Sequence, residues 1–371
     1  MANLMDYLVW RGDLPLAVDG WNGIDALAMA MVCYNDFPDA GPGARKTLKA
    51  LAALQPPFTP EDGQHVAERC GLLQRMAGTA RFGGMVLHDF VNEVDMARGI
   101  QFSAVTADAP DGSRFVSFRG TDSTLVGWKE DFMMSFESPV PAQTAAVEYL
   151  ARAAAGTSGP LRAAGHSKGG NLAVYAAANL PEDVQRRIVD IYSFDGPGLN
   201  EAVVNSESYA RVCKRIHSFV PQASIVGMLL SYHPDYKVVK STALSGIGQH
   251  NTFNWQVEGP HFVEMEQVDR GSEVIDQTLR EWLRQCAPEQ RRVFVNTLFD
   301  ILQSTDAVML GDMRRNVRAS AAAILEATRR VDPATSRMIW QLLGRFLQIG
   351  AGSLLDMLNR KPDPGAGTGT K

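Results

Sequence analysis

The segment Leu161-Arg-Ala-Ala-Gly-His-Ser-Lys-Gly-Gly-Asn171 decides the fold of this chain. A short apolar stretch leads into Gly165-His-Ser-Lys-Gly169, and alanine-rich sequence follows as far as Pro181. A strand, a sharp turn and a helix in this order are typical of a nucleophile elbow, which leaves its serine at a helix N-terminus. The alternative is an ordinary glycine-rich turn between a strand and a helix. The context favours Ser167 as an attacking nucleophile.

The sequence around this elbow alternates between strand-like and helix-like stretches. Helices are expected at residues 141–155 and 169–180. Strands are expected at residues 85–91, 101–107, 114–118, 161–164, 188–194, 215–220 and 236–239. Such alternation favours a mainly parallel sheet covered by helices on both faces. Together with the elbow, it predicts an α/β-hydrolase fold.

The pattern divides the chain into four parts. Residues 1–79 mix short helical patterns with loops, and Asn22 is placed to cap a helix. Residues 80–263 form the expected α/β core, and residues 264–360 carry helical apolar spacing. The tail at residues 361–371 is rich in Pro, Gly and Thr and is expected to be disordered. We therefore expect an N-terminal extension packed on a hydrolase core, followed by a helical region.

Composition excludes several classes of function. The 371 residues carry a net charge of -5 and no run of Lys or Arg, which argues against nucleic-acid binding. The four cysteines lie far apart, without the paired spacing of a zinc site. The N-terminus lacks the pattern of a signal peptide, so a cytoplasmic protein is expected. No metal or cofactor is expected.

The longest apolar segment, Met338 to Leu358, is interrupted by polar residues such as Arg345 and Asp356. A membrane span needs about 20 mostly apolar residues, so no transmembrane segment is expected. The apolar stripe of this segment is more typical of a packed core. Peripheral contact with a membrane or a partner through the C-terminal helices is the alternative.

A serine nucleophile needs a base, and four histidines follow Ser167 in the chain. In α/β-hydrolases the acid comes after the serine and the histidine comes last. His250 lies in a predicted loop after the last expected strand, where a base would project over the sheet edge. We therefore favour His250 over the other three, which are His217, His233 and His261.

The orienting acid is expected at Asp195. This residue ends the apolar strand at residues 188–194 and is followed by Gly196-Pro-Gly198, which fixes a turn. A carboxylate at a strand end is well placed to hold an imidazole. The alternative is a turn aspartate that caps its own backbone, and in that case Asp235 is the next candidate for the acid.

Two backbone N–H groups are expected to bind the oxyanion. One belongs to Lys168, the residue after the nucleophile. The other is expected from Thr121 in Phe118-Arg-Gly-Thr-Asp122, because this segment follows a strand and Gly120 allows a close approach of backbone to ligand. The alternative for this segment is a tight turn without a catalytic role.

These motifs resemble two families. Phe118-Arg-Gly-Thr-Asp122, followed by Trp128 and Asp131, resembles the class-three lipases, in which the residue matching Thr121 contributes to the oxyanion hole. A closer resemblance, over roughly residues 1–259, is to the Mbeg-like family, an uncharacterised bacterial branch of α/β-hydrolase-like proteins. It rests on the elbow with Lys168 and on Asp6-Tyr-Leu-Val-Trp-Arg-Gly-Asp13, Gln101-Phe-Ser-Ala104, Ser193-Phe-Asp-Gly-Pro-Gly198, Ser224-Ile-Val-Gly-Met-Leu229 and Gln249-His250.

The sequence departs from the lipases at two positions. Class-three lipases carry their acid after the next strand, where this chain has Ser224. The resemblance therefore implies either that the acid has moved to Asp195 or that the triad is incomplete. Lys168 stands where lipases commonly carry leucine, which would make the elbow more polar and argues against long-chain triglycerides.

Taken together, the residues predict an esterase-like or lipase-like serine hydrolase acting on a small-molecule or lipid ester. An amidase, peptidase or thioesterase with the same triad is an alternative. A hydrolase fold without activity, which serves as a binding or scaffold protein, is another.

Overall fold

A computed structural model describes residues 1–58, 64–121, 125–134, 137–224, 226–227, 235–243 and 246–269, together with residues 289–290, 292–293 and 295–296. Almost all of the expected C-terminal helical region, the expected tail and His233 lie outside the described residues. In the described part of the chain, no helix is both long and apolar enough to cross a membrane.

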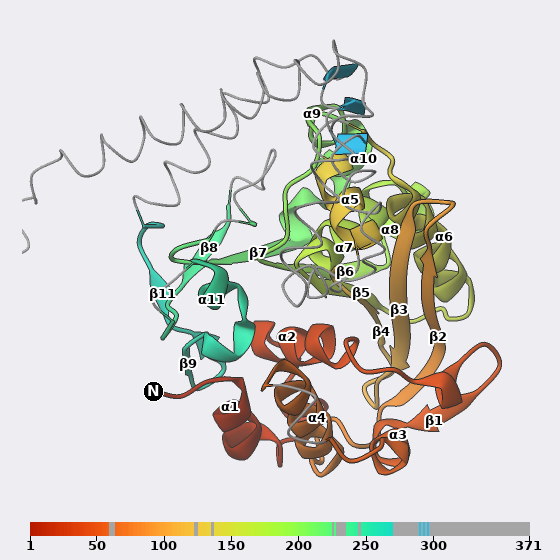
Figure 1. Ribbon diagram of the computed structural model, residues 1–371. Coiled ribbons are helices and arrows are strands. Elements are labelled where there is room, and N and C mark those ends of the chain that lie inside the picture. Colours follow the sequence, from red (N-terminus) through yellow and green to blue (C-terminus); the bar gives the residue numbers. More distant parts are fainter. Residues whose placement is uncertain are drawn as a thin grey trace, which may run out of the picture.

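A nine-stranded sheet forms the centre of the fold (Figure 1). The strands lie in the order β1-β2-β3-β4-β5-β6-β7-β8-β11. They span Arg45–Thr47, Val86–Asp95, Ile100–Asp108, Arg114–Phe118, Leu161–His166, Ile188–Phe194, Ile216–Pro221, Lys237–Val239 and Glu264–Met265. A separate hairpin pairs β9 (Val257–Glu258) with β10 (His261–Phe262).

The α/β-hydrolase fold class predicted from the sequence is confirmed, although the sheet is mixed rather than mainly parallel. Strands β4 to β8 run parallel to one another. Strands β1 to β3 and β11 pair antiparallel with their neighbours. Short turns join β2 to β3 and β3 to β4, and a short turn can only join antiparallel strands. The parallel strands form the part of the sheet that carries the elbow.

Helices cover both faces of the sheet (Figure 1). One face packs against α6 (Pro141–Ala155), α7 (Lys168–Ala178), α8 (Glu182–Gln185) and α10 (Glu207–Val212). On the other face α2 (Gly23–Val32) packs against the sheet, and α1 (Leu4–Arg11), α3 (Leu48–Leu54) and α4 (Gln64–Ala77) belong to the same hydrophobic core. The described part of the chain also contains α5 (Leu125–Met133), α9 (Glu201–Val204) and α11 (Gly246–His250).

Two hydrophobic cores result from the period-two pattern of the strands. In β3, Ile100, Phe102 and Ala104 belong to the core under α6 and α7. Val105 and Ala107 belong to the core under α2. Successive side chains of a strand point to opposite faces, so β3, which is buried at every position except its last, contributes to both cores.

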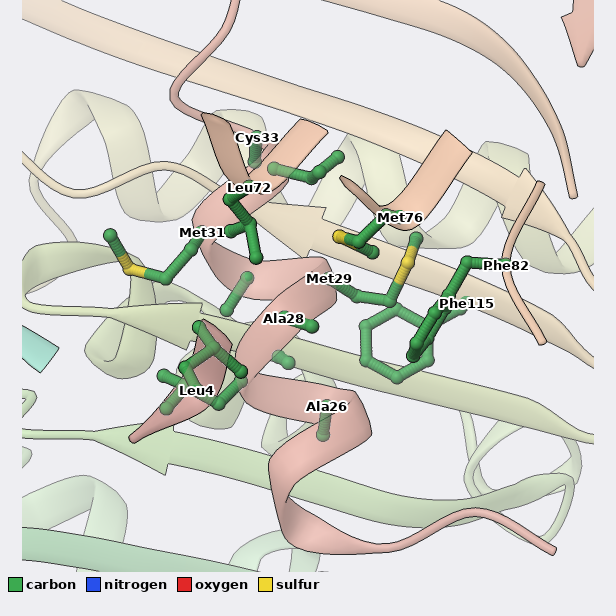
Figure 2. Packing of buried hydrophobic residues seen from close by; sticks show 14 of the residues in the cluster. Leu4, Ala26, Ala28, Met29, Met31, Cys33, Leu72, Met76, Phe82 and Phe115 are labelled. Atoms are coloured by element: carbon green, nitrogen blue, oxygen red, sulfur yellow. The ribbon is translucent and has the colours of Figure 1, made fainter. Parts of the chain in front are cut away.

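Helix α2 is the centre of the second core. Asn22 caps it as predicted, and its side chain accepts hydrogen bonds from the backbone N–H groups of Ile24 and Asp25. Every residue from Ile24 to Val32 is buried. Figure 2 shows why, because side chains from α1, α4 and β4 converge around the helix, including Leu4, Leu72, Met76 and Phe115. A helix that is apolar on all sides needs partners on all sides.

Candidate active site

Ser167 lies at the turn between β5 and α7, where the sequence predicts the elbow. Its φ of 58° and ψ of -135° define a conformation that residues other than glycine rarely adopt, which costs about 1–3 kcal/mol. Glycines on both sides allow the turn to close. A Cβ on Gly165 would lie 2.1 Å from the carbonyl carbon of Gly169, and a Cβ on Gly169 would lie 2.1 Å from the carbonyl oxygen of Phe118. Only glycine fits at these two positions.

Asp195 and His250 meet beside the carboxyl edge of the sheet. Asp195 directly follows β6, is completely buried and has a φ of 48°. His250 is the last residue of the short helix α11, and not part of a loop as expected. Its Nδ1 lies 2.6 Å from Oδ2 of Asp195. The structure therefore brings the predicted acid and the predicted base together, and it leaves Nε2 as the nitrogen available for proton transfer.

Two contacts place Ser167 next to this pair. The N–H of Ser167 donates to the carbonyl of Phe194, the residue before Asp195, over 2.9 Å. The imidazole of His166 packs against that of His250, with ring centroids 4.4 Å apart. Among the described residues, no hydrogen bond joins the Ser167 hydroxyl to His250. Such contacts are often long in a free enzyme and tighten when substrate binds.

The second oxygen of Asp195 is held by a loop that follows β7. The hydroxyl of Ser224 and the N–H of Gly227 both donate to Oδ1 of Asp195, the latter over 3.0 Å. Hydrogen bonds of this kind fix the orientation of the carboxylate. Sequence reasoning treated Ser224 as the loss of an acid. The structure places it in direct contact with Asp195.

A chain of polar groups behind His250 was not found from the sequence. His166 Nε2 lies 2.9 Å from the carbonyl oxygen of His250, and His166 Nδ1 lies 2.9 Å from the hydroxyl of Tyr34. Burial, together with the nearby His250, lowers the pKa of His166 to about 3. A neutral imidazole has one N–H, which must face the carbonyl, so the Tyr34 hydroxyl donates to Nδ1. In the sequence, Tyr34 recurs at helical spacing with Ile24 and Met31, which predicts packing on a helix face and not a contact with His166.

The expected oxyanion segment passes directly beside Ser167. A Cβ on Gly120 would lie 2.9 Å from Cβ of Ser167 and 2.6 Å from the carbonyl oxygen of His166. The hydroxyl of the next residue, Thr121, donates to Oδ2 of Asp131 over 2.5 Å. Burial raises the pKa of Asp131 to about 6, although the positive charge of Lys168 opposes this. The hydrogen of the Thr121 hydroxyl is therefore engaged, and the backbone N–H is the donor left for a ligand.

The side chain of Lys168 does not make the elbow more polar, contrary to the expectation from the sequence. It is almost completely buried, and its Nζ donates to the carbonyl and side-chain oxygens of Gln101 at 2.8 and 2.6 Å. It also forms a buried ion pair with Glu130 at 2.9 Å. The ammonium group is thus held inside the protein, so Lys168 does not disfavour long-chain acyl groups.

The other candidates lie elsewhere. His217 was expected in the core, but its side chain is 41 % exposed and pairs with Asp190. His261 is exposed in β10, and Asp235 is exposed on a turn. Within the described ranges, no group of three or more His, Cys, Asp or Glu side chains is arranged to hold a metal ion.

Comparison with known proteins identifies a family over most of the chain. The family model described as Mbeg1-like matches residues 76–300. No curated protein matches the sequence.

Three solved structures are distant neighbours, and all are lipases. M37 lipase is 15 % identical, with 55 % of this chain and 68 % of that chain covered, at a TM-score of 0.34. A triacylglycerol lipase whose catalytic centre is a serine protease triad is 16 % identical, with coverages of 59 % and 80 % and a TM-score of 0.34. The Rhizomucor miehei lipase propeptide complex is 16 % identical, with coverages of 42 % and 57 % and a TM-score of 0.28. Likenesses this remote do not bear on substrate.

Proposed function

Because the chain belongs to the Mbeg1-like family and carries an elbow serine beside a buried acid–histidine pair, we propose that it is a serine hydrolase that cleaves a carboxylic ester through an acyl-enzyme. The observation that carries the proposal is the 2.6 Å contact between Asp195 and His250, next to the strained turn of Ser167. A completely buried carboxylate on an imidazole is costly to maintain for structure alone.

Each residue has a distinct role in the proposed reaction. Ser167 Oγ attacks the acyl carbonyl, and His250 Nε2 accepts its proton. Asp195 accepts the Nδ1–H of His250, which fixes the tautomer and stabilises the imidazolium ion. The backbone N–H groups of Lys168 and Thr121 bind the oxyanion. His250 then protonates the leaving alkoxide, and water releases the acyl group by the reverse path.

A fluorophosphonate probe tests this proposal, because only an activated serine reacts with it quickly. We expect the wild-type protein to gain one label at Ser167 and Ser167→Ala to gain none. On a panel of activated esters of increasing acyl length, Ser167→Ala should lower kcat by about 10⁴- to 10⁶-fold. Ser117→Ala is the matched control, since Ser117 is also buried but its hydroxyl has no hydrogen-bond partner among the described residues.

The alternatives give different results in the same assays. A folded wild-type protein that takes no label would support a binding or scaffold role. A protein that takes the label and cleaves thioesters or amides, but no ester, would be a thioesterase or an amidase. Ser167→Ala with activity within tenfold of wild type would exclude Ser167 as the nucleophile.

A further inference from the structure

We propose that the buried ion pair between Lys168 and Glu130 is a positioning device that sets the geometry of the oxyanion hole. The inference rests on the proposed hydrolase function. Lys168 supplies a backbone N–H to the proposed hole, and its own side chain anchors that backbone to helix α5. The positioning residue is Glu130, which does not touch the substrate.

The anchoring begins at the first residue of α7. Lys168 directly follows Ser167, so any shift of its Cα moves both the proposed oxyanion donor and the nucleophile. Its ammonium group is fully committed, with three acceptors at 2.8, 2.6 and 2.9 Å from Gln101 and Glu130. The side chains of Lys168 and Glu130 are 1 % and 0 % exposed, so the pair is sheltered from solvent screening.

Glu130 connects three elements through its two oxygens. Oε2 accepts from Lys168 and, over 3.3 Å, from the N–H of Gln101 in β3. Oε1 accepts from the N–H of Ala142 in the first turn of α6, over 2.7 Å. Both oxygens of Glu130 accept hydrogen bonds, so glutamine could not replace it, because one of its two terminal atoms is an NH2 group that only donates.

The next residue of α5 reaches the other side of the proposed hole. Asp131 accepts the hydroxyl hydrogen of Thr121, the second proposed oxyanion donor. Two successive carboxylates of one helix therefore hold the two residues that flank the oxyanion position. A rigid connection between the donors is what a preorganised oxyanion hole requires, because donors displaced by about 1 Å lose much of their effect.

Stability alone is a weak explanation for this ion pair. A buried ion pair is often no better for stability than apolar residues of similar size. An apolar residue at position 168 would fill the same space without linking α7 to α5. The ion pair differs from an apolar residue at position 168 in that it connects α7 to α5.

Kinetics of Lys168→Met, Glu130→Gln and the double variant test the proposal. We expect each single variant to lower kcat about 10- to 100-fold with KM within about threefold, because the oxyanion hole acts on the transition state. The double variant should be no slower than the worse single variant, since the two residues act as one unit. Leu51→Ala is the control: Leu51 is buried in α3, and its truncation should lower stability without changing kcat.

Hydrogen exchange provides a readout that does not depend on activity. In Lys168→Met, backbone amides in residues 118–121 and 166–170 should exchange faster than in the wild type, whereas in Leu51→Ala they should not. If kcat of the single variants stayed within twofold of wild type, or if the losses simply multiplied in the double variant, the proposal would be wrong. If the wild-type protein took no fluorophosphonate label, the proposed hydrolase function would be wrong. Separately, hydrogen exchange in Lys168→Met equal to that of the wild type would refute the positioning role.

Discussion

The hydroxyl of Ser224 donates a hydrogen bond to the carboxylate of Asp195. His250 is bound to the other oxygen of the same carboxylate, so the serine and the histidine lie on opposite sides of it. The resemblance to class-three lipases implies an acid at the position of Ser224. The carboxylate of this chain therefore reaches the same neighbourhood from the adjacent strand, and the serine that replaces the expected acid now supports it.

Ser224→Ala should lower kcat/KM about tenfold, because a hydrogen bond to a charged group contributes about 1.5–3 kcal/mol and Gly227 still supplies one donor to Oδ1. Steady-state kinetics on an activated ester would measure this. Ser117→Ala serves again as the control and should leave kcat/KM unchanged. A Ser224→Ala enzyme as fast as wild type would mean that Gly227 alone holds the carboxylate.

Asp195→Asn should lower kcat by up to about 10⁴-fold while the fold is preserved, because the amide cannot select the tautomer that a proton-accepting Nε2 requires. Circular dichroism and kcat measured on the same preparation would separate the two effects. Asp235→Asn is the matched control, and it should retain nearly full activity. The opposite ranking would assign the acid to Asp235.

Exchange of the two positions offers a rescue of that loss. Since Ser224 and Asp195 are in contact, Asp195→Ser combined with Ser224→Asp should restore a carboxylate close to His250. We expect the double variant to be at least about tenfold more active than Asp195→Ser alone. If the double variant were only as active as Asp195→Ser, a carboxylate at position 224 could not substitute for the one at the end of β6.

Tyr34→Phe should lower kcat about three- to tenfold with little change in KM. Burial raises the pKa of Tyr34, so the Tyr34 hydroxyl stays protonated and can donate a hydrogen bond. Removal of this hydroxyl leaves the buried Nδ1 of His166 without its hydrogen-bond donor. His166 in turn holds the backbone of His250. Tyr175→Phe is a suitable control, because Tyr175 is a buried tyrosine of the other core. Equal effects of the two changes would argue against a link from Tyr34 to the base.

His166 should make the protein sensitive to acid. The unfolded chain binds a proton at His166 near the ordinary pKa of 6.5, whereas the folded protein does so only near 3. The unfolded state therefore holds more protons in this window, and the free energy of unfolding decreases as the pH falls from about 6.5 towards 3, by up to about 1.4 kcal/mol per pH unit. Urea titrations at several pH values should show a shallower decrease for His166→Asn.

The elements that carry chemistry were predictable because their signals are local. The elbow, the strand before Asp195 and the cap at Asn22 each lie within a few residues of the glycine, proline or asparagine that defines them. Strand β4 was predicted with the bounds that the structure has, Arg114–Phe118. Such features need no knowledge of the rest of the chain.

The features that sequence reasoning missed depend on residues far apart in the chain. Lys168 was expected to make the elbow more polar, because nothing near it in sequence reveals its contacts with Glu130 and Gln101. Tyr34 and His166 are 132 residues apart. Ser224 was compared with a pattern from other proteins, whereas its meaning depends on Asp195 in the neighbouring strand. Contacts of this kind depend on which strands lie next to each other in the folded sheet, so local sequence patterns do not predict them.

The complete burial of α2 also has a consequence for biosynthesis. This helix leaves the ribosome before the strands that it covers, and β5 follows it by some 130 residues. At typical rates of about 5–20 residues per second, roughly 6–26 s pass before these strands exist. During this time the side of α2 that faces the sheet has no partner, and a chaperone that shields it would be needed most at this stage. Premature termination before β5 should therefore give aggregating fragments rather than a folded N-terminal piece.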